Sequence, residues 1–160
     1  SLNLLLCHIK GWTRHGSFCY QIGSEEKTFE DANQDCLRKD SHLINVANRF
    51  ENAFLTSLVG MRPERYFWIG LSNKEQKETF VWTNSANVRF THFGPGMPGT
   101  IHEQPNNYNG VELCGEIYSY NLKWNDRHCE SLSSWICQIH KGTSPTLPRL
   151  LTSHCKSWRE

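Results

Sequence analysis

The sequence predicts one α+β domain with two helices near its start and several short strands after them. Three observations predict this class. Two segments with helical periodicity occur within residues 28–60, short apolar or alternating segments typical of strands follow, and a long polar loop interrupts these segments. The chain has 160 residues, of which 38% are hydrophobic, and a chain of this size is expected to bury one hydrophobic core.

The two predicted helices occupy residues 28–39 and 48–60. In the first, Thr28 and Asp31 form a capping pair. In the second, Asn48 is the predicted N-cap and Gly60 the last residue. Spacing predicts that the buried face is formed by Phe29, Ala32 and Cys36 in the first helix and by Phe50, Phe54 and Leu58 in the second.

Short strands are predicted from their apolar or alternating patterns. A hairpin is expected over residues 7–23, and a continuous apolar run, typical of a buried strand, over 65–71. Further strands are predicted at 42–46, 80–84, 88–93, 111–119, 122–126 and 134–140.

The loop of residues 94–110 contains three prolines and four glycines. A loop of this length inside a compact domain is usually functional or disordered. The sequence therefore divides into an N-terminal extension (1–6), a domain (7–140) and a linker or tail (141–160).

Seven cysteines without paired C-x-x-C spacing favour disulfides over a zinc site. Disulfides predict an oxidising compartment, so the chain is expected to be secreted or part of a cell-surface ectodomain. Six cysteines allow fifteen pairings, and Cys155 is the expected odd thiol. The net charge of +1 does not favour nucleic acid or an anionic membrane, and no apolar stretch is long enough for membrane insertion.

Catalytic motifs are missing from the sequence. There is no G-x-S-x-G elbow, phosphate loop or nucleophile with a placed base. His102 and Glu103 begin an H-E-x-x-H pattern, but Pro105 breaks the helix and residue 106 is Asn. The chain is therefore predicted not to be an enzyme.

Four motifs together resemble the C-type lectin-like domain family. They are FWIGL at 67–71, QPN at 104–106, WND at 124–126 and WICQ at 135–138. The segments NNYNGVELCGE and SSWICQIHKG are most similar to the mannose-receptor branch of endocytic receptors. The resemblance covers residues 7–140 and implies two helices, two small antiparallel sheets and a long disulfide-stapled loop region.

The resemblance also implies disulfides and a calcium site. The implied disulfides are Cys7–Cys19, Cys36–Cys137 and Cys114–Cys129. The family's sugar-binding Ca²⁺ positions correspond here to Gln104, Asn106, Glu112, Asn125 and Asp126, which are oxygen donors of the kind that Ca²⁺ prefers. Pro105 is typically cis in the family. Two neighbouring sugar hydroxyls would complete the coordination, and Tyr108 would pack on the sugar ring.

Gln-Pro-Asn departs from both family patterns, Glu-Pro-Asn for mannose, fucose or N-acetylglucosamine and Gln-Pro-Asp for galactose. The side-chain charge falls from −3 to −2, so weaker Ca²⁺ binding is expected. Asn106 and Tyr108 favour mannose-type sugars, and an alternative is that Glu103 reaches the ion. The family's auxiliary Ca²⁺ site is expected to be lost, because its acids correspond to Asn73, Lys77, Asn107 and Leu113.

Two functions follow from this resemblance. The first is Ca²⁺-dependent recognition of glycans with terminal mannose, fucose or N-acetylglucosamine. The second is Ca²⁺-independent binding of a protein ligand through the long loop and exposed aromatic residues, which Gln104 and the lost auxiliary site favour.

Overall fold

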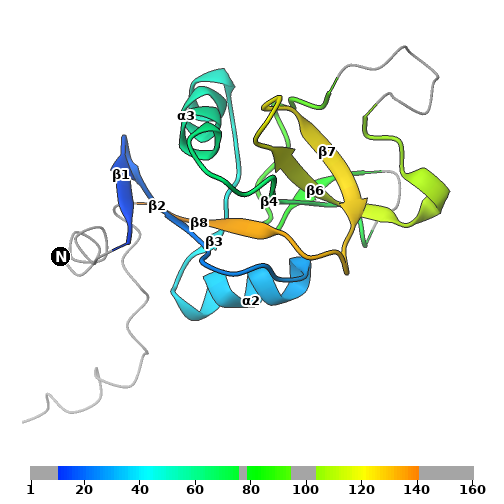
Figure 1. The fold of residues 1–160 in the computed structure, drawn as a ribbon, viewed down its shortest axis with the longest axis horizontal. Helices are drawn as coiled ribbons and strands as arrows, with labels where there is room; N and C mark the ends of the chain where they lie inside the picture. The colour runs from blue at the N-terminus through cyan, green and yellow to red at the C-terminus, as the bar shows by residue number, and fades with distance from the viewer. Residues whose placement is uncertain (1–10, 76–78, 95–103, 141–160) are drawn as a thin grey trace, which may run out of the picture.

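A computed structural model describes residues 11–75, 79–94 and 104–140 of the chain. Figure 1 shows strands at the centre, with helix α2 packed along one side. The predicted Cys7–Cys19 disulfide, the N-terminal extension and the tail with Cys155 involve residues outside these ranges and stay predictions. The same holds for Glu103 and Lys77.

Helix α2 (Phe29–Arg38) begins where the capping pattern predicts. The Thr28 hydroxyl accepts a hydrogen bond from the backbone N–H of Asp31 at 3.2 Å, which satisfies one of the unpaired donors at a helix N-terminus. The predicted buried face is confirmed, since Phe29, Ala32 and Cys36 are buried.

Helix α3 (Arg49–Gly60) also has its predicted limits, but its predicted buried face is only partly correct, because Phe50 is exposed while Phe54 and Leu58 pack against the core. The Asn48 Oδ1 accepts from the backbone N–H groups of Phe50 and Glu51 at 3.0 and 2.9 Å. The buried residues are Asn52, Leu55 and Val59, whereas Phe50 is 71% exposed and Phe54 and Leu58 are only partly buried. Asn52 can lie inside because its Oδ1 accepts from the Trp124 indole N–H at 3.1 Å.

We expect Asn48→Ala to lower the free energy of unfolding by about 1 kcal/mol, because the cap of α3 is lost. Phe50→Ala, in the first turn of the same helix, should change it by less than about 0.5 kcal/mol because the ring is exposed. Urea denaturation of both variants measures the two effects. A larger loss of stability for Phe50→Ala than for Asn48→Ala would contradict the exposed position of the Phe50 side chain.

The strands form one connected path in the order β1-β2-β8-β4-β6-β7. Strand β8 (Ser134–His140) pairs antiparallel with β2 (Phe18–Ile22) and parallel with β4 (Tyr66–Ser72), and so links the two sheets that the sequence predicts. The remaining strands are β1 (Thr13–His15), β3 (His42–Leu43), β5 (Val81–Trp82), β6 (Glu112–Tyr118) and β7 (Trp124–His128). The fold class is therefore α+β, as predicted.

The strand predicted at residues 88–93 does not form, and only a single bridge joins Phe93 to Trp124. Two backbone hydrogen bonds make this bridge, from the Trp124 N–H to the His92 carbonyl at 2.9 Å and from the Gly94 N–H to the Trp124 carbonyl at 3.0 Å. The rings of Phe90 and Phe93 pack on the same residue, with their centroids 5.8 and 5.9 Å from the Trp124 ring. Trp124 itself is fully buried, so the alternation marks a loop packed on the core.

Two of the implied disulfides lie within the described residues. Cys36–Cys137 joins α2 to β8, and Cys114–Cys129 joins β6 to the residue after β7, each with a Cα–Cα distance of 5.3 Å. The loop of residues 104–110 lies beside β7, at the end of the domain opposite the β1–β2 hairpin (Figure 1). Among the helices of the described residues, none has the length and apolar character to span a membrane.

Candidate calcium and ligand site

Asp126 connects the polar loop to strand β7. Its side chain is fully buried, and its two carboxylate oxygens accept from the backbone N–H groups of Asn106 at 3.1 Å and Asn107 at 2.6 Å. A buried carboxylate needs such donors. Residues about twenty positions apart in the chain are thereby held together.

Glu112 connects the start of β6 to the same loop. Its Oε2 accepts from the backbone N–H of Tyr108 at 3.1 Å, and the Asn106 Oδ1 accepts from the same N–H at 3.2 Å. The Glu112 and Asn106 side chains therefore lie close together. The Tyr108 side chain is 56% exposed, as a residue that packs against a ligand requires.

Asn125 lies on β7, and its side chain is held in place by a hydrogen bond to Glu116. The Asn125 amide donates to the Glu116 carboxylate at 3.2 Å and to the Asp126 carbonyl oxygen at 2.6 Å. Glu116 is fully buried and also accepts from Arg127 at 3.2 Å and from Ser133 at 3.4 Å. Because the amide nitrogen is engaged there, the Asn125 oxygen is directed away from Glu116.

Glu116 is a positioning residue that the sequence analysis missed. In the β6–β7 pairing it lies opposite Asn125. Aligning the two predicted strands so that Cys114 lies near Cys129 would have brought this acid beside the WND segment. The position of Glu116 beside Asn125 could therefore be predicted only from the register between these two strands.

Gln104 is joined to the loop through a cis bond to Pro105, the isomer that the family resemblance implies. Its Oε1 is buried and has no hydrogen-bond partner among the described residues. An unpartnered buried oxygen is costly, and a bound cation would satisfy it. The structure connects Asn106, Glu112, Asn125 and Asp126 through shared partners, whereas the Gln104 side chain lines a neighbouring pocket with Tyr118 and Lys123.

Burial changes the acid–base behaviour of the site. Burial raises the pKa of Glu112, and the nearby Asp126 carboxylate raises it too, while the Tyr108 N–H lowers it. Burial also raises the pKa of Asp126, against the lowering by the N–H groups of Asn107 and Asn106. For Glu116, burial raises the pKa to about 7, although Arg127 lowers it. Two clustered carboxylates that are partly removed from water suit a cation between them.

The four connected residues offer two carboxylates and two amide oxygens, which are ligand types that Ca²⁺ takes. Across residues 11–75, 79–94 and 104–140, no group of three or more His, Cys, Asp or Glu side chains could hold a metal ion, and the predicted set contains only two carboxylates. Of the auxiliary positions, Asn107 has its Oδ1 buried without a partner within the described chain, but Leu113 supplies no side-chain oxygen.

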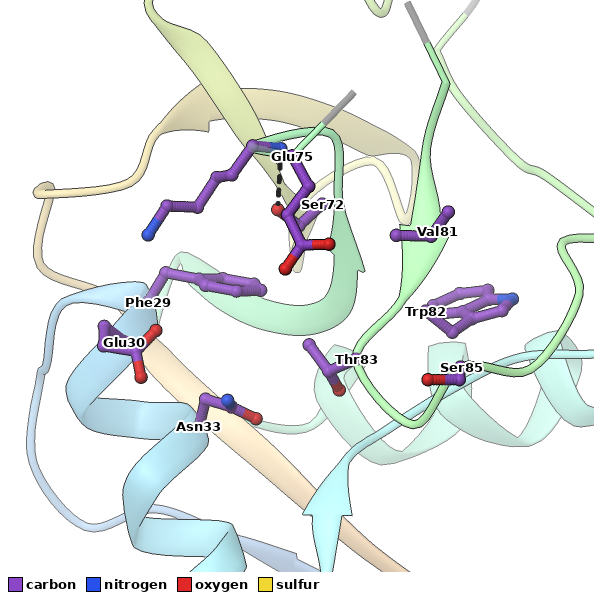
Figure 2. Close-up of a pocket in the computed structure, with 10 residues that line it drawn as sticks. Phe29, Glu30, Asn33, Ser72, Glu75, Val81, Trp82, Thr83 and Ser85 are labelled. Atoms are coloured by element: carbon purple, nitrogen blue, oxygen red, sulfur yellow. Dashed lines mark hydrogen bonds between the residues drawn. The ribbon is translucent and has the colours of Figure 1, made fainter. Parts of the chain in front are cut away.

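A separate pocket of about 460 Å³ lies between α2 and the strands β4 and β5. Figure 2 shows Glu30 and Asn33 of α2 on one side and Trp82 and Thr83 on the other. It shares no residue with the predicted calcium set, so this hollow and the candidate site are distinct regions of the molecule.

Residues 25–139 match the Lectin C-type domain family model. The chain is 31% identical over 142 residues to the human C-type mannose receptor 2, which covers 88% of this chain and 9% of that protein. It is 27% identical to a C-type lectin mannose-binding isoform from Notechis scutatus scutatus, covering 82% of this chain and 83% of the relative. The carbohydrate-recognition domain of the mouse scavenger receptor C-type lectin superposes with a TM-score of 0.73 at 28% identity, covering 86% and 99%.

The chain therefore belongs to the C-type lectin domain family, in which domains bind ligands without catalysing reactions. This membership confirms the prediction that the chain is not an enzyme. Within the family, it is similar to the mannose-receptor branch, and it spans about a tenth of the length of those receptors.

Proposed function

We propose that this chain is a Ca²⁺-dependent carbohydrate-recognition domain that binds glycans ending in mannose, fucose or N-acetylglucosamine. The observation that carries the proposal is the convergence of Asn106, Glu112, Asn125 and Asp126 at one end of the domain. Gln104, two residues before Asn106, adds a buried oxygen without a partner among the described residues. Relatives whose names specify mannose binding or mannose receptors support the sugar class.

The chain's own groups would recognise a pair of neighbouring hydroxyls. A bound Ca²⁺ ion would supply direct coordination of two sugar oxygens. Glu112 is an acceptor for a hydroxyl proton, the amides of Gln104 and Asn106 are donors to hydroxyl oxygens, and the buried Asp126 would face only the ion. The exposed Tyr108 ring would cover one face of the sugar.

Two disulfides within the described residues support an extracellular site of action, because disulfides persist in oxidising compartments. We propose that the chain acts as a secreted lectin or as part of the ectodomain of an endocytic receptor. Weak binding by one domain would then be strengthened by avidity from several domains.

The alternative function is Ca²⁺-independent binding of a protein ligand. Gln104 supplies no charge to the cation set, and the loop and its surroundings expose large apolar side chains, namely Tyr108, Val111 and Tyr120. Exposed tyrosines such as Tyr108 and Tyr120 are enriched in protein interfaces. A chelator separates the two functions, because only the first is lost with Ca²⁺.

Calorimetric titration of the chain with Ca²⁺, followed by retention on mannose resin with and without chelator, tests the proposal. We expect binding that the chelator abolishes. Gln104→Glu should raise Ca²⁺ affinity about tenfold, because ligand charge tunes the affinity of such sites, and it should strengthen mannose retention.

Glu103→Gln is the matched control for this experiment. If Gln104 is the ligand, the control should leave Ca²⁺ affinity unchanged. If Glu103→Gln lowered Ca²⁺ affinity and Gln104→Glu did not raise it, the Ca²⁺ ligand would be Glu103 and not Gln104. Retention of sugar in chelator, or no Ca²⁺ heat at all, would remove the proposal and leave the protein-binding alternative.

A further inference from the structure

Gln104 lines a polar pocket of about 280 Å³ whose other residues do not belong to the predicted calcium set. The residues that matter for its chemistry are Gln104, Tyr118, Tyr120, Asn121 and Lys123. Gln104 thus borders both this pocket and the loop that carries Asn106. The pocket and the predicted calcium set are therefore joined through Gln104, which stands two residues before Asn106 in the chain.

Two stacked tyrosines form one wall of the pocket. Tyr120 is 72% exposed, and its ring stacks on that of Tyr118 at 5.2 Å with an interplanar angle of 24°. Tyr118 packs in turn against Tyr66 at 5.2 Å. An exposed ring that is supported from behind offers a flat apolar face with a polar edge, which suits the C–H face of a second sugar unit.

Lys123 supplies a positive charge to the pocket. Its ammonium lies 3.1 Å from the His92 Nε2. Burial and the neighbouring Lys123 charge lower the pKa of His92, so the neutral imidazole accepts a hydrogen bond from the ammonium, which keeps its charge. No Asp or Glu of the described residues lines the pocket, and none forms an ion pair with Lys123. The cation therefore lacks an internal counter-charge there.

The turn that carries these groups is held in place before any ligand binds. The Leu122 N–H donates to the Tyr118 carbonyl at 2.8 Å, and the Tyr118 N–H donates to the Lys123 carbonyl at 3.0 Å. The Asn121 side chain accepts from the Lys123 N–H at 3.0 Å. A turn fixed in this way loses little conformational entropy when it binds.

We propose that this pocket is a second saccharide subsite that binds a sugar unit bearing an anionic group, either a sulfate ester or a carboxylate. The inference rests on the proposed function, because Gln104 borders both subsites. At the first subsite, the predicted calcium set, the carboxylates of Glu112 and Asp126 would repel an anion. At the second, the pocket, the ammonium of Lys123 attracts one. The chain would therefore prefer acidic glycans to neutral ones of the same backbone.

Four probes test the subsite by calorimetry in Ca²⁺ at low ionic strength: methyl α-mannoside, mannotriose, sulfated mannotriose and a mannuronate trisaccharide. We expect at least one anionic trisaccharide to bind about fivefold more tightly than mannotriose, as an exposed charge contact allows. Lys123→Gln should remove this preference and leave methyl α-mannoside binding unchanged. Lys123→Arg should restore it, and Lys74→Gln, at a remote exposed lysine, is the matched control.

The outcomes separate the subsite from the proposed function. Tighter binding of sulfated mannotriose alone identifies sulfate as the anion, and tighter binding of the mannuronate identifies a carboxylate. An anion preference that persists in Lys123→Gln, or no preference in the original chain, overturns the subsite. Failure of methyl α-mannoside to bind overturns the proposed sugar site, while a Lys123-dependent preference among the anionic probes would still support the pocket.

Discussion

Replacing both Cys36 and Cys137 with serine is expected to lower the free energy of unfolding by about 4–5 kcal/mol. The two residues are separated by 101 positions, and closing so long a loop removes much entropy from the unfolded chain. The measurement is guanidinium denaturation without reductant, in a Cys155→Ser background that removes the predicted odd thiol.

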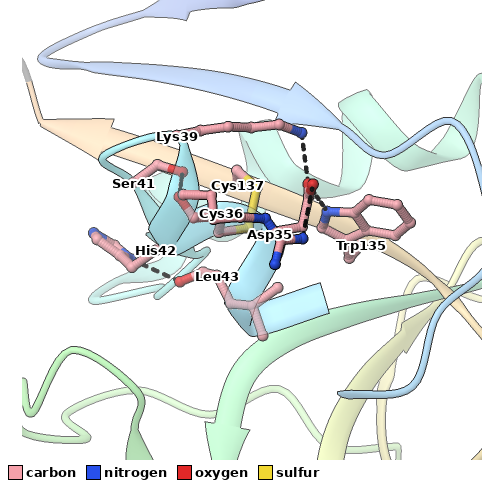
Figure 3. Close-up of a disulfide and its surroundings, with 9 residues drawn as sticks. Asp35, Cys36, Lys39, Ser41, His42, Leu43, Trp135 and Cys137 are labelled. Carbon is pink, nitrogen blue, oxygen red and sulfur yellow. Dashed lines mark hydrogen bonds and ion pairs between the residues drawn. A yellow bond between two sulfur atoms is a disulfide. The ribbon is translucent and has the colours of Figure 1, made fainter. Parts of the chain in front are cut away.

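The contacts around this disulfide predict a weakened domain that still folds. Figure 3 shows the disulfide between α2 and β8. The Asp35 carboxylate accepts from the Trp135 indole N–H at 3.1 Å, and the Ser41 hydroxyl donates to the Cys36 carbonyl at 2.6 Å. The first of these hydrogen bonds joins α2 to β8 as the disulfide does, the second fixes the chain at the end of α2, and both remain after the substitution.

Cys114→Ser with Cys129→Ser is the matched comparison. This disulfide closes a separation of only 15 positions, so about 3 kcal/mol is expected. It lies close to Glu112, however, and its removal should weaken Ca²⁺ binding, whereas loss of Cys36–Cys137 should leave Ca²⁺ affinity unchanged in the folded protein. The opposite pattern in both measurements would contradict the assignment of one disulfide to the scaffold and the other to the site.

Local signals in the sequence predicted the elements that depend on neighbouring residues. The Thr28 cap and the buried face of α2 were correct because capping and helical periodicity act within one or two turns. The predicted face of α3 failed at Phe50 because two sets of positions have helical spacing. The face that is buried includes Asn52, whose Oδ1 accepts from the indole N–H of Trp124, 72 positions away, and no local pattern indicates that contact.

Long-range packing explains the other differences. Residues 88–93 were predicted as a strand, but Phe90 and Phe93, three positions apart, both pack on the buried indole of Trp124 in β7. The resemblance placed Asn106, Glu112, Asn125 and Asp126 together, and the structure brings these four close. It did not indicate that Glu116 supports Asn125, since that contact depends on the register between β6 and β7.

Acidification is expected to weaken Ca²⁺ binding by at least about tenfold between about pH 7.5 and about pH 5. Ca²⁺ requires ionised carboxylates, so protons compete for Glu112 and Asp126. Burial raises the pKa of both groups, and this competition therefore begins at a higher pH than for ordinary carboxylates. Calorimetric titrations across this range measure the effect.

Glu116→Gln identifies which carboxyls cause the loss. The variant keeps Glu112 and Asp126 but removes the carboxyl that accepts from Asn125, and acid should still weaken its Ca²⁺ binding. If the pH dependence disappeared in this variant, Glu116 would be the sensor. An affinity that does not change over the whole range would contradict the role of Glu112 and Asp126 as ligands.

Thermal unfolding tests the same linkage with the opposite sign. A carboxyl with a raised pKa binds more protons in the folded state, so its contribution to stability is largest at low pH and is lost as pH rises through the folded-state pKa. For Glu116 this window runs from 4.5 to about 7. Without Ca²⁺, the domain should therefore lose the stability that Glu112, Glu116 and Asp126 contribute as pH rises. Ca²⁺ binds the ionised forms of Glu112 and Asp126, so it should stabilise the domain most at high pH.

The difference in Tm between calcium and chelator isolates the site from other titrating groups. Burial lowers the pKa of His42 and His92, which removes stability as pH falls, but both histidines are present in either solution. We expect the calcium-induced rise in Tm to be large at about pH 7.5 and to vanish near about pH 5. A rise of equal size at both pH values would mean that Ca²⁺ binds without displacing protons from Glu112 and Asp126.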